Sequence, residues 1–389
     1  MKYRVLFLVV WACYAVHTGR TQEVTLLFAG DAMQHQSQLA NAYRNGFYDY
    51  SSYFGHIRDE VLSADIAVVN LEVTLGGPPY AGYPQFSAPD EFAYALRDAG
   101  FNLFLNANNH ILDRGSKGVF RTLDRLDSMK IVHTGVFRNE EERNRMYPLM
   151  FMKGGIRFAI LNYTYGTNGI AVPPPVYVNY IDKEQIRKDV QKAYSLNADI
   201  IIANMHWGDE YKLVQNREQE DLAAFMAKEG INLVIGSHPH VVQPSKVIAD
   251  FGGRITHVIT YSLGNFVSGM IAPNTDGGQV VKIVLEKQPF RQVEIKSAEY
   301  ALVFRNKERV KGKVHFSVIP VSMAEKNDTV PYAPAIGLEP ASYLKMTEFA
   351  KSARWIFNRY NVGIGEYKMG TPKPEINNYN KFSSILFAN

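Results

Sequence analysis

Acidic and imidazole side chains follow directly after strand-like apolar runs in this sequence of 389 residues. Asp31 follows VTLLFAG, Glu72 follows AVVNL and His206 follows IIIANM, while His238 and His240 come after INLVIGS. Carboxylates and imidazoles bind divalent ions, and two adjacent ions can promote an in-line displacement at phosphorus. These residue types predict a metal centre, although a turn or a helix cap can explain any one of them alone.

Two further runs end in the same way. FNLFLNA leads into Asn108, Asn109 and His110, and HVITYS leads shortly to Asn265. Because the carboxyl ends of parallel strands share one edge of a sheet, all these side chains are expected in one crevice. The spacing of the two histidines around Pro239 predicts an extended segment that points both rings the same way.

The elements that must position these residues belong to an α/β fold. From Val24 to about Val267, nearly continuous apolar runs alternate with amphipathic helical patterns, which is typical of a layered, largely parallel sheet. The expected strands cover residues 24–29, 65–70, 101–106, 156–163, 199–205, 231–235 and 255–262. A helix is expected over residues 116–129.

The pattern changes after about residue 275. Residues 279–287, 293–304 and 314–320 alternate apolar and polar side chains, which predicts short, half-exposed antiparallel strands. A helix over 338–360 follows, with Leu344, Phe349, Trp355 and Ile356 as its apolar anchors, and then a polar tail. We therefore expect a main domain over residues 22–275 and a C-terminal extension over 276–389.

Residues 1–20 have the pattern of a signal peptide. Lys2 and Arg4 precede an apolar stretch over 5–16, which is shorter than the ~20 residues of a spanning helix. The leader predicts an exported protein, in the bacterial periplasm or cell envelope. Alternatives are an uncleaved N-terminal anchor and a lipid anchor through Cys13, which is the one cysteine of the chain.

Composition excludes several other functions. The net charge is only +4, and no run of Lys and Arg is long enough to indicate nucleic-acid binding. With Cys13 in the leader, the body has no thiolate nucleophile or ligand. The sequence also lacks the G-x-S-x-G, P-loop and H-E-x-x-H motifs.

The motifs AGDAM, NLE, NANNHILDRG, MHWGDEY, IGSHPHVVQ and TYSLGNFV form a specific set. Over residues 22–270 the chain resembles the CapA family of capsule or poly-γ-glutamate synthesis proteins. That family is similar to the calcineurin-like metallophosphoesterases, so the resemblance implies a four-layer αββα sandwich with a two-metal site.

The resemblance also implies roles for individual residues. Two divalent ions (Mn, Fe or Zn) would be held by Asp31, Glu72, Asn109, His206, His238 and His240, with Glu72 in the bridging position. His110 would act on the reacting group as acid or electrophile, and Asp113 would orient the His110 side chain.

Two features depart from the phosphoesterase pattern. Met33 stands where a histidine is usual, and Glu72 replaces the usual bridging aspartate. His35 or Asn70 could supply an additional ligand, or the site could hold fewer ligands. Five residues near the strand ends are candidates for substrate binding: Tyr163, Tyr165, Asn168, Trp207 and Asn265.

Two functions are consistent with this sequence. The first is a two-metal hydrolase or transferase acting on an envelope polymer, its lipid-linked precursor or a phosphoester. The second is a non-catalytic binding or assembly subunit on the same scaffold. In either case the expected partners are the polymer or its precursor and membrane-bound synthesis or export proteins.

Overall fold

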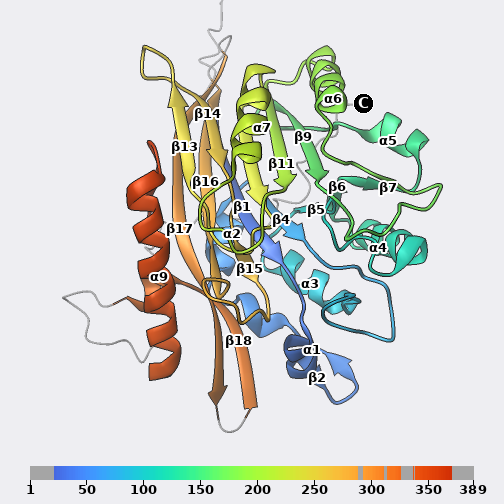
Figure 1. Cartoon of the computed structure of the whole chain (residues 1–389), viewed down its shortest axis with the longest axis vertical. Coiled ribbons are helices and arrows are strands. Elements are labelled where there is room, and N and C mark those ends of the chain that lie inside the picture. The colour runs from blue at the N-terminus through green and yellow to red at the C-terminus, as the bar shows by residue number, and fades with distance from the viewer. Residues whose placement is uncertain (1–21, 288–291, 311–312, 326–335, 337, 370–389) are drawn as a thin grey trace, which may run out of the picture.

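The computed structural model describes residues 22–287, 292–310, 313–325, 336 and 338–369 (Figure 1). The expected leader and the polar tail lie outside the described residues. Within the described part, no helix has both the length and the apolar character needed to cross a bilayer.

The first half of the sheet is parallel. β1 (Gln22–Ala32), β4 (Ile66–Leu71), β5 (Leu103–Leu105) and β6 (Val132–Thr134) lie side by side in that order. The connections between β4, β5 and β6 contain α3 (Asp90–Asp98) and α4 (Gly115–Ser128). Because such crossovers cover the strands, β4 and β5 are buried along their whole length.

The second half is also mainly parallel. β9 (Ile156–Thr164), β11 (Ile200–His206), β12 (Leu233–Ser237) and β14 (Ile255–Thr260) pair in that order. α6 (Lys183–Ser195) and α7 (Arg217–Lys228) connect them. Antiparallel edges are added by β8 (Leu149–Lys153) and β13 (Ser245–Ala249).

The C-terminal strands complete the same sheet. β16 (Gly277–Lys287) pairs with β1 from Gln22↔Lys287 to Phe28↔Val281, and β17 (Val293–Val310) pairs with β16. β17 also meets β14 at Ile255↔Ile295, which joins the two halves into one 15-stranded sheet. The strands are antiparallel as predicted but not short, since β17 has 18 residues.

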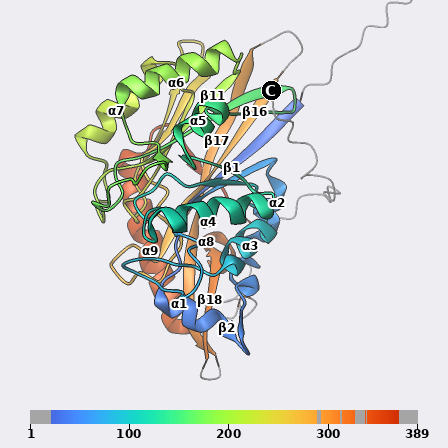
Figure 2. The ribbon, with the colours of Figure 1, turned by 90° about the vertical axis from the view of Figure 1, so that its right-hand side faces the viewer.

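The two halves of the sheet face each other and are covered by helices outside. One apolar cluster, which includes Leu26, Ile160 and Ile202, lies between the halves. A second packs the first half against α2 (Arg58–Ser63) and α3, and a third packs the second half against α6 and α7, which lie together and apart from α3 and α4 (Figure 2). The predicted four-layer α/β arrangement is confirmed.

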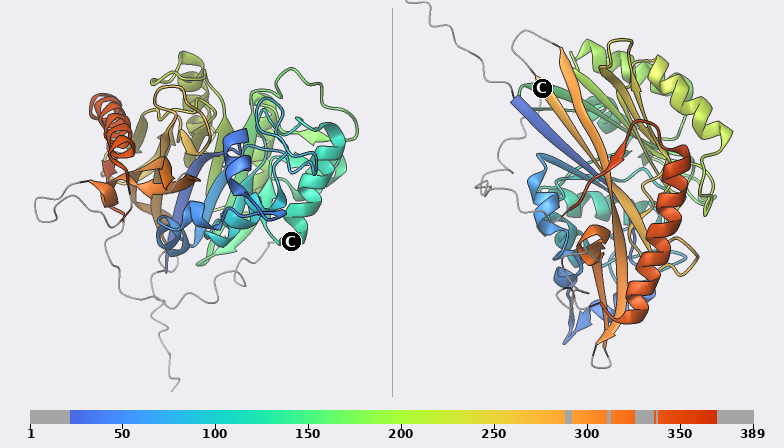
Figure 3. Two further views of the ribbon diagram at one scale, coloured as in Figure 1. Left: turned by 90° about the horizontal axis from the view of Figure 1, so that it is seen from below. Right: turned by 90° about the vertical axis from the view of Figure 1, so that its left-hand side faces the viewer.

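Helix α9 (Pro340–Tyr360) lies along the flank of β17 (Figure 3). Phe349 and Ile356 are buried there, as predicted, and Phe357 packs edge-on against Tyr300 with ring centroids 4.7 Å apart. The prediction was wrong for Leu344 and Trp355, which are 63% and 60% exposed. Both belong to the outer face of the helix.

The remaining elements are short: some extend the main sheet by pairing with β1 or β17, and the others connect or cap the layers. They are α1 (Gln36–Ala42), β2 (Tyr43–Arg44), β3 (Phe47–Tyr48), the 3₁₀ helix η1 (Ser51–Phe54), β7 (Val136–Phe137), α5 (Glu140–Met146), β10 (Tyr177–Val178), β15 (Asn265–Val267), β18 (Lys313–Pro320), α8 (Val321–Ala324) and β19 (Gly365–Glu366).

Candidate metal centre

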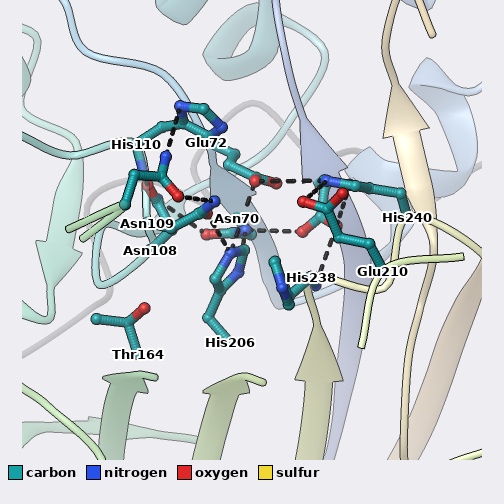
Figure 4. Close-up of polar contacts among 12 residues, drawn as sticks. Asn70, Glu72, Asn108, Asn109, His110, Thr164, His206, Glu210, His238 and His240 are labelled. Atoms are coloured by element: carbon teal, nitrogen blue, oxygen red, sulfur yellow. Dashed lines mark hydrogen bonds and ion pairs between the residues drawn. The ribbon is translucent and has the colours of Figure 1, made fainter. Parts of the chain in front are cut away.

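The strand ends do bring the predicted ligands together. Asp31 lies near the end of β1, Glu72 directly after β4, His206 at the end of β11 and His238 directly after β12. All of them are almost completely buried. Figure 4 shows Glu72, His206 and His238 pointing toward one another. The carboxyl edges of both sheet halves thus form one polar cluster.

Two groups of donor atoms in this cluster have the separations of metal ligands. Glu72, His238 and His240 form one group, and Asp31, Glu72 and His206 form the other, with the donor atoms of each group within 4.8 Å of one another. Glu72 belongs to both. Neither of its carboxylate oxygens has a hydrogen-bond partner among the described residues, and Nδ1 of His238 has none either. Because buried polar atoms are rarely left unpaired, these donors fit bound cations.

The backbone around the two histidines is turned rather than extended. His238 and His240 have φ angles of +99° and +59°, in the left-handed region that side chains other than glycine seldom adopt. The amide of His238 donates to Oδ2 of Asp31 at 3.1 Å, which ties this turn to β1. The expectation of an extended segment was therefore wrong, and backbone strain of this kind is concentrated at functional sites.

Burial and mutual charge set the ionisation of the cluster. Burial favours the neutral form of Asp31, but His240, His206 and Asn70 outweigh it and hold the pKa of Asp31 well below its usual value. Burial and the charge of Asp31 raise the pKa of Glu72 well above its usual value. Burial also lowers the pKa of His206, and lowers the pKa of His238 to about 3. The neutral imidazoles are thus available as ligands at pH 7.

Asparagine side chains connect the ligands. Nδ2 of Asn70 donates to Oδ1 of Asp31 at 2.7 Å and lies 3.2 Å from Nδ1 of His206. Oδ1 of Asn109 lies 2.7 Å from Nε2 of His206. Asn70 therefore positions Asp31 and His206, while the amide oxygen of Asn109 lies beside the His206 imidazole.

His110 is held next to this cluster by Asp113. Nδ1 of His110 lies 2.8 Å from Oδ2 of Asp113, which also accepts the amide of Phe86 at 2.7 Å. Phe86 packs edge-on against the His110 ring with centroids 4.7 Å apart. A proton on Nδ1 donates to this carboxylate, which leaves Nε2 as the nitrogen that a substrate can meet.

Three exposed tyrosines stand at the rim of the site. The Tyr165 ring lies 4.4 Å from that of His238, and the Tyr83 and Tyr211 rings lie 6.5 Å and 6.3 Å from His110 and His240. Asn168 accepts from Nδ2 of Asn109 at 3.0 Å. Of the substrate-binding candidates, Tyr165 and Asn168 are therefore at the rim, while Asn265 contacts the candidate ligand His240 at 3.1 Å.

Three candidates do not reach the cluster. Tyr163 is buried and donates to Asp189 at 2.8 Å, and the Trp207 indole donates to the carbonyl of Tyr261 at 2.9 Å. Both pack beneath α6 and α7. His35 lies near the rim but belongs to neither donor group. Its Nδ1 accepts a hydrogen bond from the amide of Gly269 at 3.1 Å, and its ring packs on Phe86.

Two further site residues had no role assigned from the sequence, since Asn108 was expected only to lie in the crevice and Glu210 was not singled out. Asn108 donates to the carbonyl of Leu71 at 2.9 Å and accepts the amide of His110 at 3.2 Å, so it joins two strand ends. Oε1 of Glu210 lies 4.0 Å from Nε2 of His240. Both residues occur within the motifs NANNHILDRG and MHWGDEY, which were the available signal.

Close backbone contact places Asp31 and Asn265 side by side. A Cβ on Gly30 would lie 1.9 Å from the carbonyl oxygen of Gly264, which itself has a φ of +67°. The amide of Asp31 donates to that same oxygen at 3.0 Å. Only glycine allows this approach, so these two positions are needed for the geometry of the site.

A cavity of about 1010 Å³ lies apart from this cluster. Its lining comes from η1, α2, α3 and the starts of β5 and β6, and includes none of the candidate ligands. The chemistry-bearing residues are thus grouped at the opposite, carboxyl edge of these strands.

The fold and the site define a layered α/β protein whose buried histidines and carboxylates are grouped as metal ligands are. The model of the family described as "Bacterial capsule synthesis protein PGA_cap" matches residues 25–270, and the chain belongs to this family. The predicted resemblance to CapA proteins is confirmed.

Two curated relatives support the same conclusion. The capsule biosynthesis protein CapA of Bacillus anthracis is 29% identical over 266 residues, which are 63% of this chain and 60% of that protein. The PGA biosynthesis protein CapA of Bacillus subtilis (strain 168) is 30% identical over 209 residues, which are 53% of this chain and 52% of that protein. The chain thus spans between half and three-fifths of these relatives.

Two solved structures are similar to the chain at lower identity. The NAD nucleotidase NadN of Haemophilus influenzae has a TM-score of 0.46 at 14% identity, covering 90% of this chain and 58% of that one. The calcineurin-like phosphoesterase YfkN of Bacillus subtilis has a TM-score of 0.43 at 13% identity, covering 87% of this chain and 99% of that one.

Proposed function

We propose that this protein is a metal-dependent hydrolase or transferase in capsule or poly-γ-glutamate synthesis. The observation that carries the proposal is the pair of donor groups sharing Glu72, whose buried oxygens have no partner among the described residues. The CapA relatives named for capsule and PGA biosynthesis supply the biological context.

Different residues would bind the metal ions and transfer the proton. Asp31, Glu72, His206, His238 and His240, with the amide oxygen of Asn109, would hold two divalent ions such as Mn, Fe or Zn. Bound ions would supply charge neutralisation and an activated water or other nucleophile. His110, held through its Nδ1 by Asp113, presents Nε2 to the leaving group and can donate or accept a proton there.

The predicted leader indicates in which compartment the protein would act. An exported protein would meet the envelope polymer, or its lipid-linked precursor, outside the cytoplasm, together with membrane-bound proteins of polymer synthesis or export. Localisation of the full chain in fractionated cells tests this part of the proposal, and recovery in the cytoplasmic fraction alone would contradict it.

Metal content tests the centre directly. Elemental analysis of the purified full chain is expected to find about two equivalents of transition metal, and an Asp31→Ala, His238→Ala double variant is expected to lose them. Absence of bound metal, even after incubation with manganese, iron or zinc, would exclude the two-metal reaction. If the wild type holds the metal and the variant loses it, phosphoesters and γ-glutamyl compounds are the substrates to screen.

One observation favours the non-catalytic alternative. Met33, at the position where phosphoesterases usually carry a histidine, is buried in an apolar cluster and offers no nitrogen or oxygen to an ion. A protein that binds polymer but has no activity in such a screen, with or without metal, would be a binding or assembly subunit instead.

A further inference from the structure

The Nε2 atom of the His240 imidazole faces two carboxyl groups. Its Nε2 is 3.9 Å from Oε1 of Glu72 and 4.0 Å from Oε1 of Glu210, both beyond hydrogen-bond distance (Figure 4). Its Nδ1 is engaged elsewhere, at 3.1 Å from Oδ1 of Asn265 and 3.4 Å from Oδ2 of Asp31. Nε2 is therefore the nitrogen that remains for an ion, and two carboxyl oxygens lie near it.

The donor group around His240 otherwise contains little negative charge. The carboxylate of Asp31 already accepts hydrogen bonds from Nδ2 of Asn70 and from the amide of His238, and Glu72 is shared with the second donor group. Met33 adds no ligand. A further oxygen is what this end of the centre lacks.

The backbone holds Glu210 at this place. The amide of Tyr211 donates to the carbonyl of Pro239 at 2.9 Å, which fixes the segment carrying Glu210 against the turn that carries both histidines. Tyr211 adopts a φ of +66° to make this contact. Residues other than glycine seldom adopt this conformation, so the surrounding structure must enforce it.

We propose that Glu210 is an additional carboxylate ligand of the ion held by His240. This assignment rests on the proposed metal centre and extends it to a residue at the rim. Ligand atoms at roughly 2.0–2.2 Å from one ion stand about 3–3.5 Å apart, so Glu210 must approach by roughly half to one ångström. Its side chain is 43% exposed, so the protein core does not enclose it.

Metal titration of the purified, metal-stripped full chain tests the assignment. Calorimetry with Mn²⁺ is expected to show two sites in the wild type and, in Glu210→Gln, at least tenfold weaker binding at one of them. Asp209→Asn is the matched control, because it removes a neighbouring exposed charge and is expected to leave both affinities within about twofold. The electron paramagnetic resonance signal of bound Mn²⁺ gives a second readout, and circular dichroism checks the fold.

The outcomes separate the two proposals. A wild type that binds no metal overturns both the centre and the role of Glu210. A wild type with two sites and a Glu210→Gln variant with unchanged affinities overturns only the role of Glu210. If Glu210→Gln and Asp209→Asn weaken binding equally, general surface charge is responsible and the assignment is also wrong.

Discussion

Asp113 is the residue that gives His110 a defined orientation. Its carboxylate holds Nδ1 of His110 and is itself fixed by the amide of Phe86. Asn at this position keeps the size of the side chain but can no longer act as an anionic partner for the imidazole. The ring would then lose the carboxylate that fixes its orientation.

Asp113→Asn is accordingly expected to lower the turnover of a substrate found in the screen by on the order of 10²-fold. Metal content should stay at the wild-type value, because Asp113 lies in neither donor group. Steady-state kinetics and elemental analysis on the same preparation measure both. Asp124→Asn, which removes an exposed partner of Arg138, is the control, and equal activity of the two variants would contradict the role.

The buried imidazole of His35 is expected to make the free energy of unfolding depend on pH. Burial, helped by the charges of His240 and His110, lowers its pKa from 6.5 to about 3. Between these two values the unfolded chain takes up a proton that the folded chain does not, so stability is lost as the pH falls from 6.5 towards 3 and is fully present above 6.5. A full proton difference corresponds to about 1.4 kcal/mol per pH unit.

His35→Gln removes this one titration while its amide oxygen can still accept the amide of Gly269. Denaturant unfolding of metal-stripped protein at pH 7 and pH 4.5 is the measurement. The free energy of unfolding should fall less between these pH values in the variant than in the wild type. Parallel losses in both proteins would show that His35 is not buried in its neutral form.

Single residues near the strand ends show what the sequence could and could not predict. His206 and Trp207 are neighbours, yet His206 faces the cluster while Trp207 packs beneath the helices. Tyr163, near the end of β9, also packs beneath the helices, because successive side chains of a strand point to opposite faces. Strand ends could be located from apolar runs, but the face of each residue depends on the exact phase of the strand.

At the scale of elements, the sequence predicted the parallel strands well and the later ones less well. Each of the seven expected strands overlaps an observed one, since continuous apolar runs of this length favour strands buried on both faces. The alternating runs after residue 275 suggested half-exposed strands, whereas the first seven residues of β16 are all buried, including the polar Gln279 and Lys282. Segments from distant parts of the chain cover both faces of β16 and β17. The local alternation of apolar and polar residues cannot show such coverage.

The contact between β1 and the segment at Gly264 is expected to tolerate no side chain. Gly30→Ala places a methyl group against a backbone oxygen, so the strands must separate, at a cost of about 1–3 kcal/mol. Gly55→Ala is the matched control, because a Cβ there meets nothing within 4 Å. Urea unfolding compares the two, and a stability loss no larger than that of the control would contradict the close packing.

The same substitution should also affect the centre, because Asp31 is the next residue along β1. Metal affinity of Gly30→Ala is expected to fall even under conditions where the variant is fully folded. Calorimetric titration at low temperature measures this, and an affinity equal to that of Gly55→Ala would show that β1 adjusts without moving the carboxylate.

At the scale of the whole molecule, the family match and the folded unit have different limits. The match ends at residue 270, before β16 begins at Gly277. Yet β16 pairs with β1 over seven residues, from Gln22 to Phe28, and β17 joins the two halves of the sheet. The helix α9 adds Met346, Phe349 and Phe357 to the core between those halves.

A chain that ends at residue 275 is therefore expected not to fold, although it keeps every candidate metal ligand. It would leave β1 with an unpaired edge next to Asp31 and would open the central apolar cluster to water, and such edges promote aggregation. Circular dichroism and the cooperativity of thermal unfolding compare it with the full chain. A truncated protein that unfolds cooperatively and binds two equivalents of Mn²⁺ would show instead that residues 276–389 are an addition to a self-sufficient domain. The expected loss of both properties would mean that the site depends on strands whose sequence carries none of its motifs.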